Sequence, residues 1–484
     1  MTIATPPCGA IQGEQGRGAV HFRGIPYAAA ARFALPVRLA PWGGTRDGTR
    51  HGPIPPQPPS RLRAAMGDFV RPRDEDCLTL TIATPEADAG ARPVLVFLHG
   101  GAYWTGAGSL DWYDGAVLAA ENGCVVVGVN YRLGALGFLA HPAVSPANLG
   151  LADMAAALGW VQDNIAAFGG DPGRVTVVGQ SAGAHAIMML LADTASMGLF
   201  HRGVLMSAPA DMAPKTAVQA AQDAEFLAEA LGVAVSGLAQ VPVQALLDAG
   251  LKLARAGARF ADATPPFHPV DDALADPAQF VAIVAREAAA RGVRLMIGTT
   301  REEMHAFFVP DPGMDAPDPG QVEACAARIA GEAGAVEAYR QRRPGATVRD
   351  VLGDLVTDAM FLRPSIALAE ALTEAGGQAH VYQFDAAGAG NRFMACHCID
   401  LPFLFGNFEA WSDAAMLEGF NPGQAQAIST RFRGAVAAFA RAGEAWPRYD
   451  TADRLTMVFG TITGPVRDPA GAAWRPVFAL RKES

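Results

Sequence analysis

The feature that most constrains this chain is a five-residue turn, Gly179-Gln180-Ser181-Ala182-Gly183, which directly follows the largely β-branched run 174–178. A helix-like segment, 184–191, comes next. Glycine-x-serine-x-glycine between a strand and a helix is typical of a sharp turn that lifts the serine hydroxyl clear of a sheet. Both glycines are expected where strand and helix pass too close for a Cβ atom. The turn therefore predicts that Ser181 is a nucleophile.

Strand-like and helix-like segments alternate on both sides of this turn. The helix-like segment 152–168 carries apolar residues at helical spacing and ends at a glycine-rich stop, 169–172. Near-continuous apolar strands are typical of a sheet that is buried on both faces. The chain is therefore predicted to be α/β, with a large, mostly parallel central sheet and helices on both faces. The expected strands are 19–27, 79–84, 93–98, 124–130, 175–178, 294–298 and 380–384.

No linker divides the 484 residues, so we expect a single catalytic domain over 1–484. The region at about 211–290 is alanine-rich and helical, with breaks at Pro242 and at Pro265-Pro266. It and a second region at about 315–375 are predicted to be helical insertions over the active site that shape the pocket. The amphipathic segment 424–442 is predicted to be the terminal helix.

Composition excludes several classes of function. A net charge of −10 argues against nucleic-acid binding, which needs a basic footprint. The longest apolar runs, such as 94–98, have the length of a strand, so no membrane span is expected. Residues 1–18 lack the basic and apolar regions of a signal peptide. Six cysteines are too few for a disulfide scaffold, which favours a reduced, cytoplasmic protein.

A metal site is not expected. Cys396 and Cys398 flank His397, but this C-x-C spacing has no second cluster to complete a zinc site.

A serine hydroxyl needs a base, in general a histidine, and a carboxylate that orients the histidine. In chains with a serine turn of this kind the order is serine, acid, histidine, with acid and base on loops after later strands. Two adjacent carboxylates, Glu302 and Glu303, follow the strand at 294–298, and His397 follows the strand at 380–384. The order is therefore the expected one, although ten histidines compete for the role of base.

The third element of such a site is an oxyanion hole. The strand at 94–98 ends in the glycine-rich turn 99–104. Glycines there allow backbone N–H groups to point at the negative oxygen of a tetrahedral intermediate. The expected donors are the N–H groups of Gly101, Ala102 and Ala182.

The chain resembles the type-B carboxylesterases of the α/β-hydrolase fold, and within them the bacterial para-nitrobenzyl esterases. Gly100-Gly101-Ala102 favours the bacterial group, because cholinesterases commonly carry three glycines there. The similarity spans most of the chain. It is carried by the segments 22–27, 75–78, 99–108, 130–134, 164–165, 168–172, 179–183, 298–303, 397–403 and 446–449.

The resemblance implies roles for individual residues. The family's acid occupies the second carboxylate position, which implies Glu303 as the acid, His397 as the base and Glu302 as a solvated neighbour. His99, His185 and His201 would then be structural.

Two structural ion pairs are also implied by the family pattern. One joins Arg32 to Glu75 and the other joins Arg132 to Asp153. Both would support the scaffold rather than the chemistry.

Several positions depart from the family's pattern. Gln180 stands where many relatives have a glutamate that helps to hold a cationic alcohol group, so a neutral alcohol portion is favoured. Met154 and Met304 replace a glutamine and a glycine that are common in the family, and the disulfide partner of Cys77 is missing from the loop 53–59. Ser207 resembles a serine that supports the acid and the base. Further candidates for the pocket wall are Tyr103, Trp104, Met206, Phe307 and Phe308.

The resulting hypothesis is a serine carboxylesterase that cleaves small-molecule esters through an acyl-enzyme on Ser181, without cofactor. The alternative is a carbamate or amide hydrolase that uses the same triad. A more remote alternative is a catalytically silent binding protein on this fold. The chain is expected to be a monomer or a homodimer.

Overall fold

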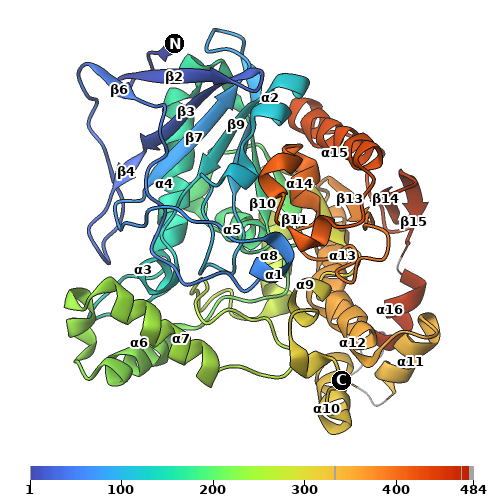
Figure 1. The fold of residues 1–484 in the computed structure, drawn as a ribbon. Coiled ribbons are helices and arrows are strands. Elements are labelled where there is room, and N and C mark those ends of the chain that lie inside the picture. The colour runs from blue at the N-terminus through green and yellow to red at the C-terminus, as the bar shows by residue number, and fades with distance from the viewer. Residues whose placement is uncertain (1, 332–333, 470, 479–484) are drawn as a thin grey trace.

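A 13-stranded sheet crosses the protein in the computed structural model, which describes residues 2–331, 334–469 and 471–478 (Figure 1). Its centre is parallel, as predicted, whereas the edges are antiparallel. The central strands, in spatial order, are β9 (Val125–Val129), β8 (Arg92–Leu98), β10 (Gly170–Gln180), β11 (Arg202–Met206), β12 (Arg294–Thr300), β13 (Ala379–Phe384) and β14 (Leu455–Phe459).

Short connections account for the antiparallel pairs β1–β2, β2–β3 and β14–β15, because strands joined by a few residues cannot form a parallel crossover. The edge strands are β1 (Thr2–Ala4), β2 (Ala10–Gly16), β3 (Ala19–Pro26) and β7 (Thr79–Thr84) on one side and β15 (Gly464–Arg467) on the other. Strand β6 (Thr45–Asp47) pairs with β2, and β4 (Ala28–Ala29) with β5 (Val37–Arg38) forms a separate small sheet.

Alternate residues of the central strands face two apolar cores. In β8, Val94, Val96 and Leu98 belong to one core, whereas Leu95 and Phe97 belong to the other. A strand that is apolar on both sides must be covered on both sides. The predicted burial of both faces is therefore confirmed.

Helices cover each face of the sheet. The face that carries Val94 packs against α4 (Leu149–Asn164), α5 (Ala182–Ala192), α8 (Pro277–Ala290) and α13 (Arg363–Glu374). The opposite face packs against α2 (Ala116–Asn122), α14 (Asp400–Phe405) and α15 (Pro422–Ala442). Figure 1 shows α15 along one side of the sheet, away from α4 and α5.

Capping residues set where these helices begin and end. Helix α8 begins after Asp276, whose carboxylate accepts from the N–H of Gln279, and Pro277 takes its first position. Helix α15 begins after Asn421 in the same way and ends at Gly443, which has a left-handed φ of 75°.

The two regions predicted as insertions contain mostly helix. They hold α6 (Ala217–Leu231) and α7 (Val243–Ala256), and α10 (Pro319–Ala330), α11 (Ala335–Arg342) and α12 (Val348–Thr357). Figure 1 shows α6 and α7 at the lower left of the molecule, beyond the sheet, and α10 to α12 at the lower right. Helices α8 and α13 lie at the ends of these regions and pack on the sheet itself. The one-domain organisation of the whole chain stays a prediction.

One expectation for the C-terminal part is wrong. Helix α15 is not the terminal helix, because β14, β15 and α16 (Gly471–Phe478) follow it. Strand β14 completes the parallel sheet beside β13. Its residues alternate between buried and half-buried, which gives a weaker apolar signal than that of the central strands. Within the described residues, no helix is long and apolar enough to cross a membrane.

Candidate active site

Ser181 occupies a strained turn between β10 and α5. Its φ of 55° and ψ of −120° lie in a region that residues other than glycine rarely adopt. A Cβ atom on Gly179 would lie 2.4 Å from the backbone of Gly183, and one on Gly183 would lie 2.0 Å from the carbonyl oxygen of Leu98. Backbone contact therefore enforces both glycines of the predicted turn.

The glycine-rich turn after β8 lies beside this serine. Gly101 and Ala102 both have positive φ, of 114° and 59°. Within the described part of the chain, the N–H groups of these two residues and of Ala182 donate to no other protein group. The N–H of Ala182 is free because it opens helix α5, whose first turn has no intrahelical acceptors. Three N–H donors are thus available at one end of the cleft described below.

Glu303 and His397 form a buried pair. The Nδ1 atom of His397 lies 2.5 Å from Oε2 of Glu303, and neither side chain is exposed by more than 1%. The other carboxylate oxygen of Glu303 accepts from the N–H of Thr300 at 2.8 Å. The rings of Phe307 and Phe361 lie 5.5 and 5.1 Å from the His397 ring. The imidazole is therefore held on one side by the carboxylate and is enclosed by aromatic rings.

The loops that carry this pair are tied to each other. The N–H of Glu302 donates to the carbonyl of Ala395, and the N–H of His397 donates to the carbonyl of Glu303. The N–H of Ala395 donates at 3.1 Å to the side chain of Glu302. Glu302 is only 5% exposed, so the expectation of a solvated neighbour is wrong. Burial raises the pKa of Glu302, and the charge of Arg301 acts in the opposite direction.

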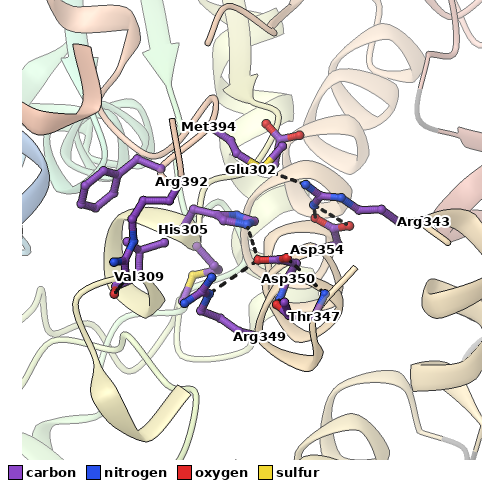
Figure 2. A network of polar contacts seen from close by, with 12 residues as sticks. Glu302, His305, Val309, Arg343, Thr347, Arg349, Asp350, Asp354, Arg392 and Met394 are labelled. Atoms are coloured by element: carbon purple, nitrogen blue, oxygen red, sulfur yellow. Dashed lines mark hydrogen bonds and ion pairs between the residues drawn. The ribbon is translucent and has the colours of Figure 1, made fainter. Parts of the chain in front are cut away.

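A polar network lies behind these loops (Figure 2). Figure 2 shows His305 pointing at Asp350 of α12, with 3.3 Å between Nε2 and Oδ1. This contact lowers the pKa of Asp350. Arg343 donates to Asp354 at 3.3 Å and contacts the sulfur of Met394 at 2.7 Å. Helix α12 is thereby joined both to the loop of Glu303 and to the loop of His397.

Three further polar side chains are buried, and one of them, Gln180, contacts His397. The amide nitrogen of Gln180 lies 3.1 Å from Nε2 of His397. Ser207 has a φ of 52°, and its buried hydroxyl has no partner within the described residues. Asp400 is fully buried and accepts from the hydroxyl of Tyr382 at 3.1 Å. Burial and the nearby charge of Glu303 raise the pKa of Asp400 to about 7.

A cleft of about 820 Å³ opens at these residues. Its lining brings together Ser181, Ala182, Gly101, Ala102 and His397, so the serine, the histidine and the free N–H groups face one space. The other lining residues are mainly apolar: Pro58, Pro59, Ser60, Arg61, Leu62, Trp104, Thr105, Pro209, Met212, Leu251, Ala263, Thr264, Pro265, Phe307, Met360 and Phe361.

Only some of the remaining residues predicted for the pocket wall line the cleft. Trp104 and Phe307 line it, whereas Met206 and Phe308 are buried in the two cores. Tyr103 is fully buried, and its hydroxyl lies 2.6 Å from Nδ1 of His185. Along this turn the side chain of Trp104 thus faces the cleft, whereas that of its neighbour Tyr103 faces the core.

Sequence reasoning missed part of the wall. Met360 and Phe361 come from a π-helical turn, Asp358–Leu362, between α12 and α13. Such turns are rare and often occur at functional sites. The hydroxyl of Tyr339 donates to Asp358 at 2.6 Å, which anchors the turn. Neither the turn nor its place beside His397 has a periodic signal in the sequence.

The histidines expected to be structural lie outside the cleft lining. His99 stacks on Tyr131 with 4.3 Å between ring centroids, and burial lowers its pKa to about 4. His185 contacts the carbonyl of Met212 at 2.7 Å, and burial lowers its pKa to about 4 as well. His201 accepts from the N–H of Val175 just before β11.

Both ion pairs implied by the resemblance are present. Nη2 of Arg132 lies 2.7 Å from Oδ1 of the buried Asp153. Nε of Arg32 donates to Glu75 at 2.8 Å. These pairs lie on the scaffold rather than in the cleft.

No group of three or more metal-ligating side chains occurs among the described residues. Cys396 and Cys398, beside His397, are buried and unpaired. Burial raises the pKa of both thiols.

Comparisons with known proteins identify the family. The model of the carboxylesterase family matches residues 1–457. The probable N-octanoylanthranilate hydrolase AqdA2 of Rhodococcus erythropolis is 39% identical, with 92% of this chain and 95% of the relative covered. The para-nitrobenzyl esterase of Bacillus subtilis is 33% identical, with 99% of each chain covered.

A solved structure with a similar fold supports the same family. A carboxylesterase of Geobacillus stearothermophilus superposes with a TM-score of 0.86 at 30% identity, with 99% of this chain and all of that chain covered. Its fold is the α/β-hydrolase fold that the resemblance implies. The chain therefore belongs to the carboxylesterase family and is a serine hydrolase of carboxylic esters.

Proposed function

We propose that Ser181, His397 and Glu303 are the catalytic triad of this esterase. The observation that carries the proposal is the buried contact between Glu303 and Nδ1 of His397, in a cleft that Ser181 also lines. With Nδ1–H donating to the carboxylate, Nε2 is the basic nitrogen that can take a proton from the serine. The contact of the Gln180 amide with Nε2 fits this tautomer, because an N–H donor needs an acceptor there.

The reaction then follows from the geometry. The hydroxyl oxygen of Ser181 attacks the ester carbonyl carbon, and its proton passes to Nε2 of His397. The N–H groups of Gly101, Ala102 and Ala182 hold the negative oxygen of the tetrahedral intermediate. The C–O bond to the alcohol breaks, and the alcohol leaves with the proton from His397. Water then cleaves the acyl-enzyme with the same histidine as base. These reaction steps need neither a metal nor an organic cofactor.

The substrate class is a small-molecule ester with an alcohol portion that is not cationic. The lining of the cleft is mainly apolar, and Gln180 carries no charge that would hold a cation. Gln180, whose amide contacts Nε2 of His397, and Ser207 would then support the base rather than contact the substrate.

Amide or carbamate hydrolysis with the same triad is a second candidate. It is favoured by the 39% identical relative, whose name states that it hydrolyses N-octanoylanthranilate. The remote alternative of a silent binding protein has less support, because all three triad positions keep their reactive side chains.

The cellular location and the assembly state stay predictions. Six unpaired cysteines agree with a reduced, cytoplasmic protein. The chain is expected to be a monomer or a homodimer, which sedimentation of the purified protein tests.

Hydrolysis of p-nitrophenyl esters from acetate to decanoate tests the proposed function. The Ser181→Ala variant should lose at least about a thousandfold in kcat/KM, while the exposed Ser412→Ala control should match the wild type. The profile over chain length measures the acyl part of the cleft. Activity that survives Ser181→Ala in a folded sample would assign the nucleophile elsewhere.

A further inference from the structure

One feature of the cleft is not explained by ester hydrolysis alone. Among the described residues that line it, Arg61 is the one side chain with a permanent charge. Arg61 lies on the proline-rich loop just before α1 (Arg63–Met66). The rest of the lining is mainly apolar. An isolated arginine in an apolar small-molecule site is typical of recognition of an anionic group.

The position of Arg61 relates it to the catalytic histidine. Its guanidinium carbon lies 5.8 Å from the ring centroid of Phe307, on α9 (His305–Phe308), and that ring lies 5.5 Å from the ring of His397. Figure 1 shows α1 beside α9. The ring of Phe307 therefore lies between the guanidinium of Arg61 and the imidazole of His397 as a shared neighbour. This span fits one small aromatic or aliphatic group between a reacting ester oxygen and a distal charge.

The guanidinium keeps donors for a ligand. Nη2 of Arg61 donates to the carbonyl of Ala263 at 3.1 Å. Within the described residues no carboxylate lies within ion-pair distance of Arg61, and its side chain remains exposed. Asp262 is the acidic group whose charge acts on it, and one oxygen of Asp262 accepts from the N–H of Thr264. An arginine has five N–H donors, so most of them are available.

The catalytic cycle decides which part of the substrate would reach Arg61. The leaving alcohol takes its proton from His397, so the alcohol portion lies on the side of His397 and Phe307. The negative oxygen of the intermediate lies on the other side, at Gly101, Ala102 and Ala182.

We infer that Arg61 binds a carboxylate on the leaving portion of the substrate. The preferred substrates are then esters of alcohols or phenols that carry a carboxylate. This inference rests on the proposed function, and it replaces the sequence-based expectation of a neutral alcohol portion with an anionic one.

A matched pair of substrates tests it: the butanoate ester of 3-hydroxybenzoic acid, which is anionic, and the butanoate ester of methyl 3-hydroxybenzoate, which is neutral. The measured quantity is the ratio of kcat/KM for the anionic ester to that for the neutral one, corrected for their rates with hydroxide alone. Arg61→Gln keeps an amide N–H for the carbonyl of Ala263 but removes the charge. Arg61→Lys keeps the charge without the fork.

The Arg61→Gln variant should lower this kcat/KM ratio at least about tenfold, through a higher KM for the anionic ester. The Arg61→Lys variant should retain part of the preference for the anionic ester. The exposed, neighbouring Arg63→Gln serves as the control and should leave the ratio unchanged. A ratio that Arg61→Gln does not move overturns the inference, even if both esters are cleaved. A purely structural arginine would lower both rates together and also leave the ratio unchanged.

A binding measurement separates this inference from the proposed function. The product 3-hydroxybenzoate should bind the wild type in calorimetry, and methyl 3-hydroxybenzoate should bind more weakly. Arg61→Gln should remove that difference. If the wild type cleaves neither ester, ester hydrolysis fails for this class, whereas calorimetry still decides on Arg61. Equal binding of both products by the wild type overturns the inference.

Discussion

The serine side and the acid–histidine side of this site are built by different means. Ser181 is held by steric contact of backbone, between two glycines that are four residues apart in sequence. Glu303 and His397 are 94 residues apart and meet through hydrogen bonds between two loops. The first arrangement is local and has little freedom. The second depends on buried polar groups from several elements.

This difference indicates which positions of the site tolerate substitution. A backbone that is packed against a backbone admits almost no substitution. A hydrogen-bonded loop pair can lose one bond and still keep its shape, because several bonds share the task. Substitutions of the two glycines should therefore act on the fold, whereas those on the acid–histidine side should act on rate and pH dependence.

The largest effect is expected for Gly183→Ala, which tests the steric side of the comparison. The new Cβ would lie 2.0 Å from the carbonyl oxygen of Leu98, so β8 and α5 must separate. We expect loss of the folded enzyme, measured by circular dichroism and by thermal unfolding. Gly434→Ala on α15 is the control, because a Cβ there meets open space and alanine favours a helix. A Gly183→Ala variant as stable as the control would break the comparison.

Glu303→Gln should come next, with a loss in kcat on the order of 10³–10⁴ and an intact fold. The amide cannot stabilise the imidazolium and favours the wrong tautomer of His397. Steady-state kinetics measure the loss in kcat, and a melting curve measures whether the fold is intact. Glu374→Gln, an exposed residue of α13, is the matched control. Retention of a tenth of the activity by Glu303→Gln would argue against Glu303 as the acid.

Glu302→Ala sharpens the comparison, because Glu302 positions the histidine loop without a contact to the substrate. Loss of the bond from the N–H of Ala395 should lower kcat by about tenfold and leave KM nearly unchanged. Glu302→Gln keeps an acceptor oxygen and should restore most of kcat. A merely structural role predicts instead that both variants lose stability and that kcat per folded molecule stays constant.

The smallest effect is expected for Asp400→Asn and concerns stability against pH. The pKa of Asp400 is about 7 in the fold and near 3.8 when unfolded, so the unfolded chain loses the proton first as pH rises. The contribution of Asp400 to stability is therefore most favourable below about pH 4 and falls between there and pH 7. From pH 5 to 6 the variant should gain on the wild type by about 1 kcal/mol in free energy of unfolding. Urea unfolding at several pH values measures this gain. A difference in free energy of unfolding between variant and wild type that does not change with pH would contradict it.

Much of the fold could be predicted because its signals are local. Strand β7 has the predicted bounds, 79–84, and β8 begins one residue earlier than predicted. Strand β10 extends further towards the N-terminus than the apolar run 175–178, because Gly170, which is not part of that run, pairs with Arg92 of β8 ahead of an irregularity in the register. The strands β14 and β15 were missed because they lie at the edge of the sheet, where burial is incomplete.

The sequence by itself determined the serine turn, the oxyanion turn and the order of serine, acid and histidine. The two turns depend on residue types at short spacing, where steric exclusion leaves one conformation, and the order of the three residues can be read directly along the chain. Only the tertiary structure decided that Glu302 is buried and that a π-helical turn brings Phe361 against His397. It also placed Arg61 over Phe307, across 246 residues of chain. These contacts join segments far apart in sequence, and they arise from packing and loop closure, which leave no periodic pattern along the chain.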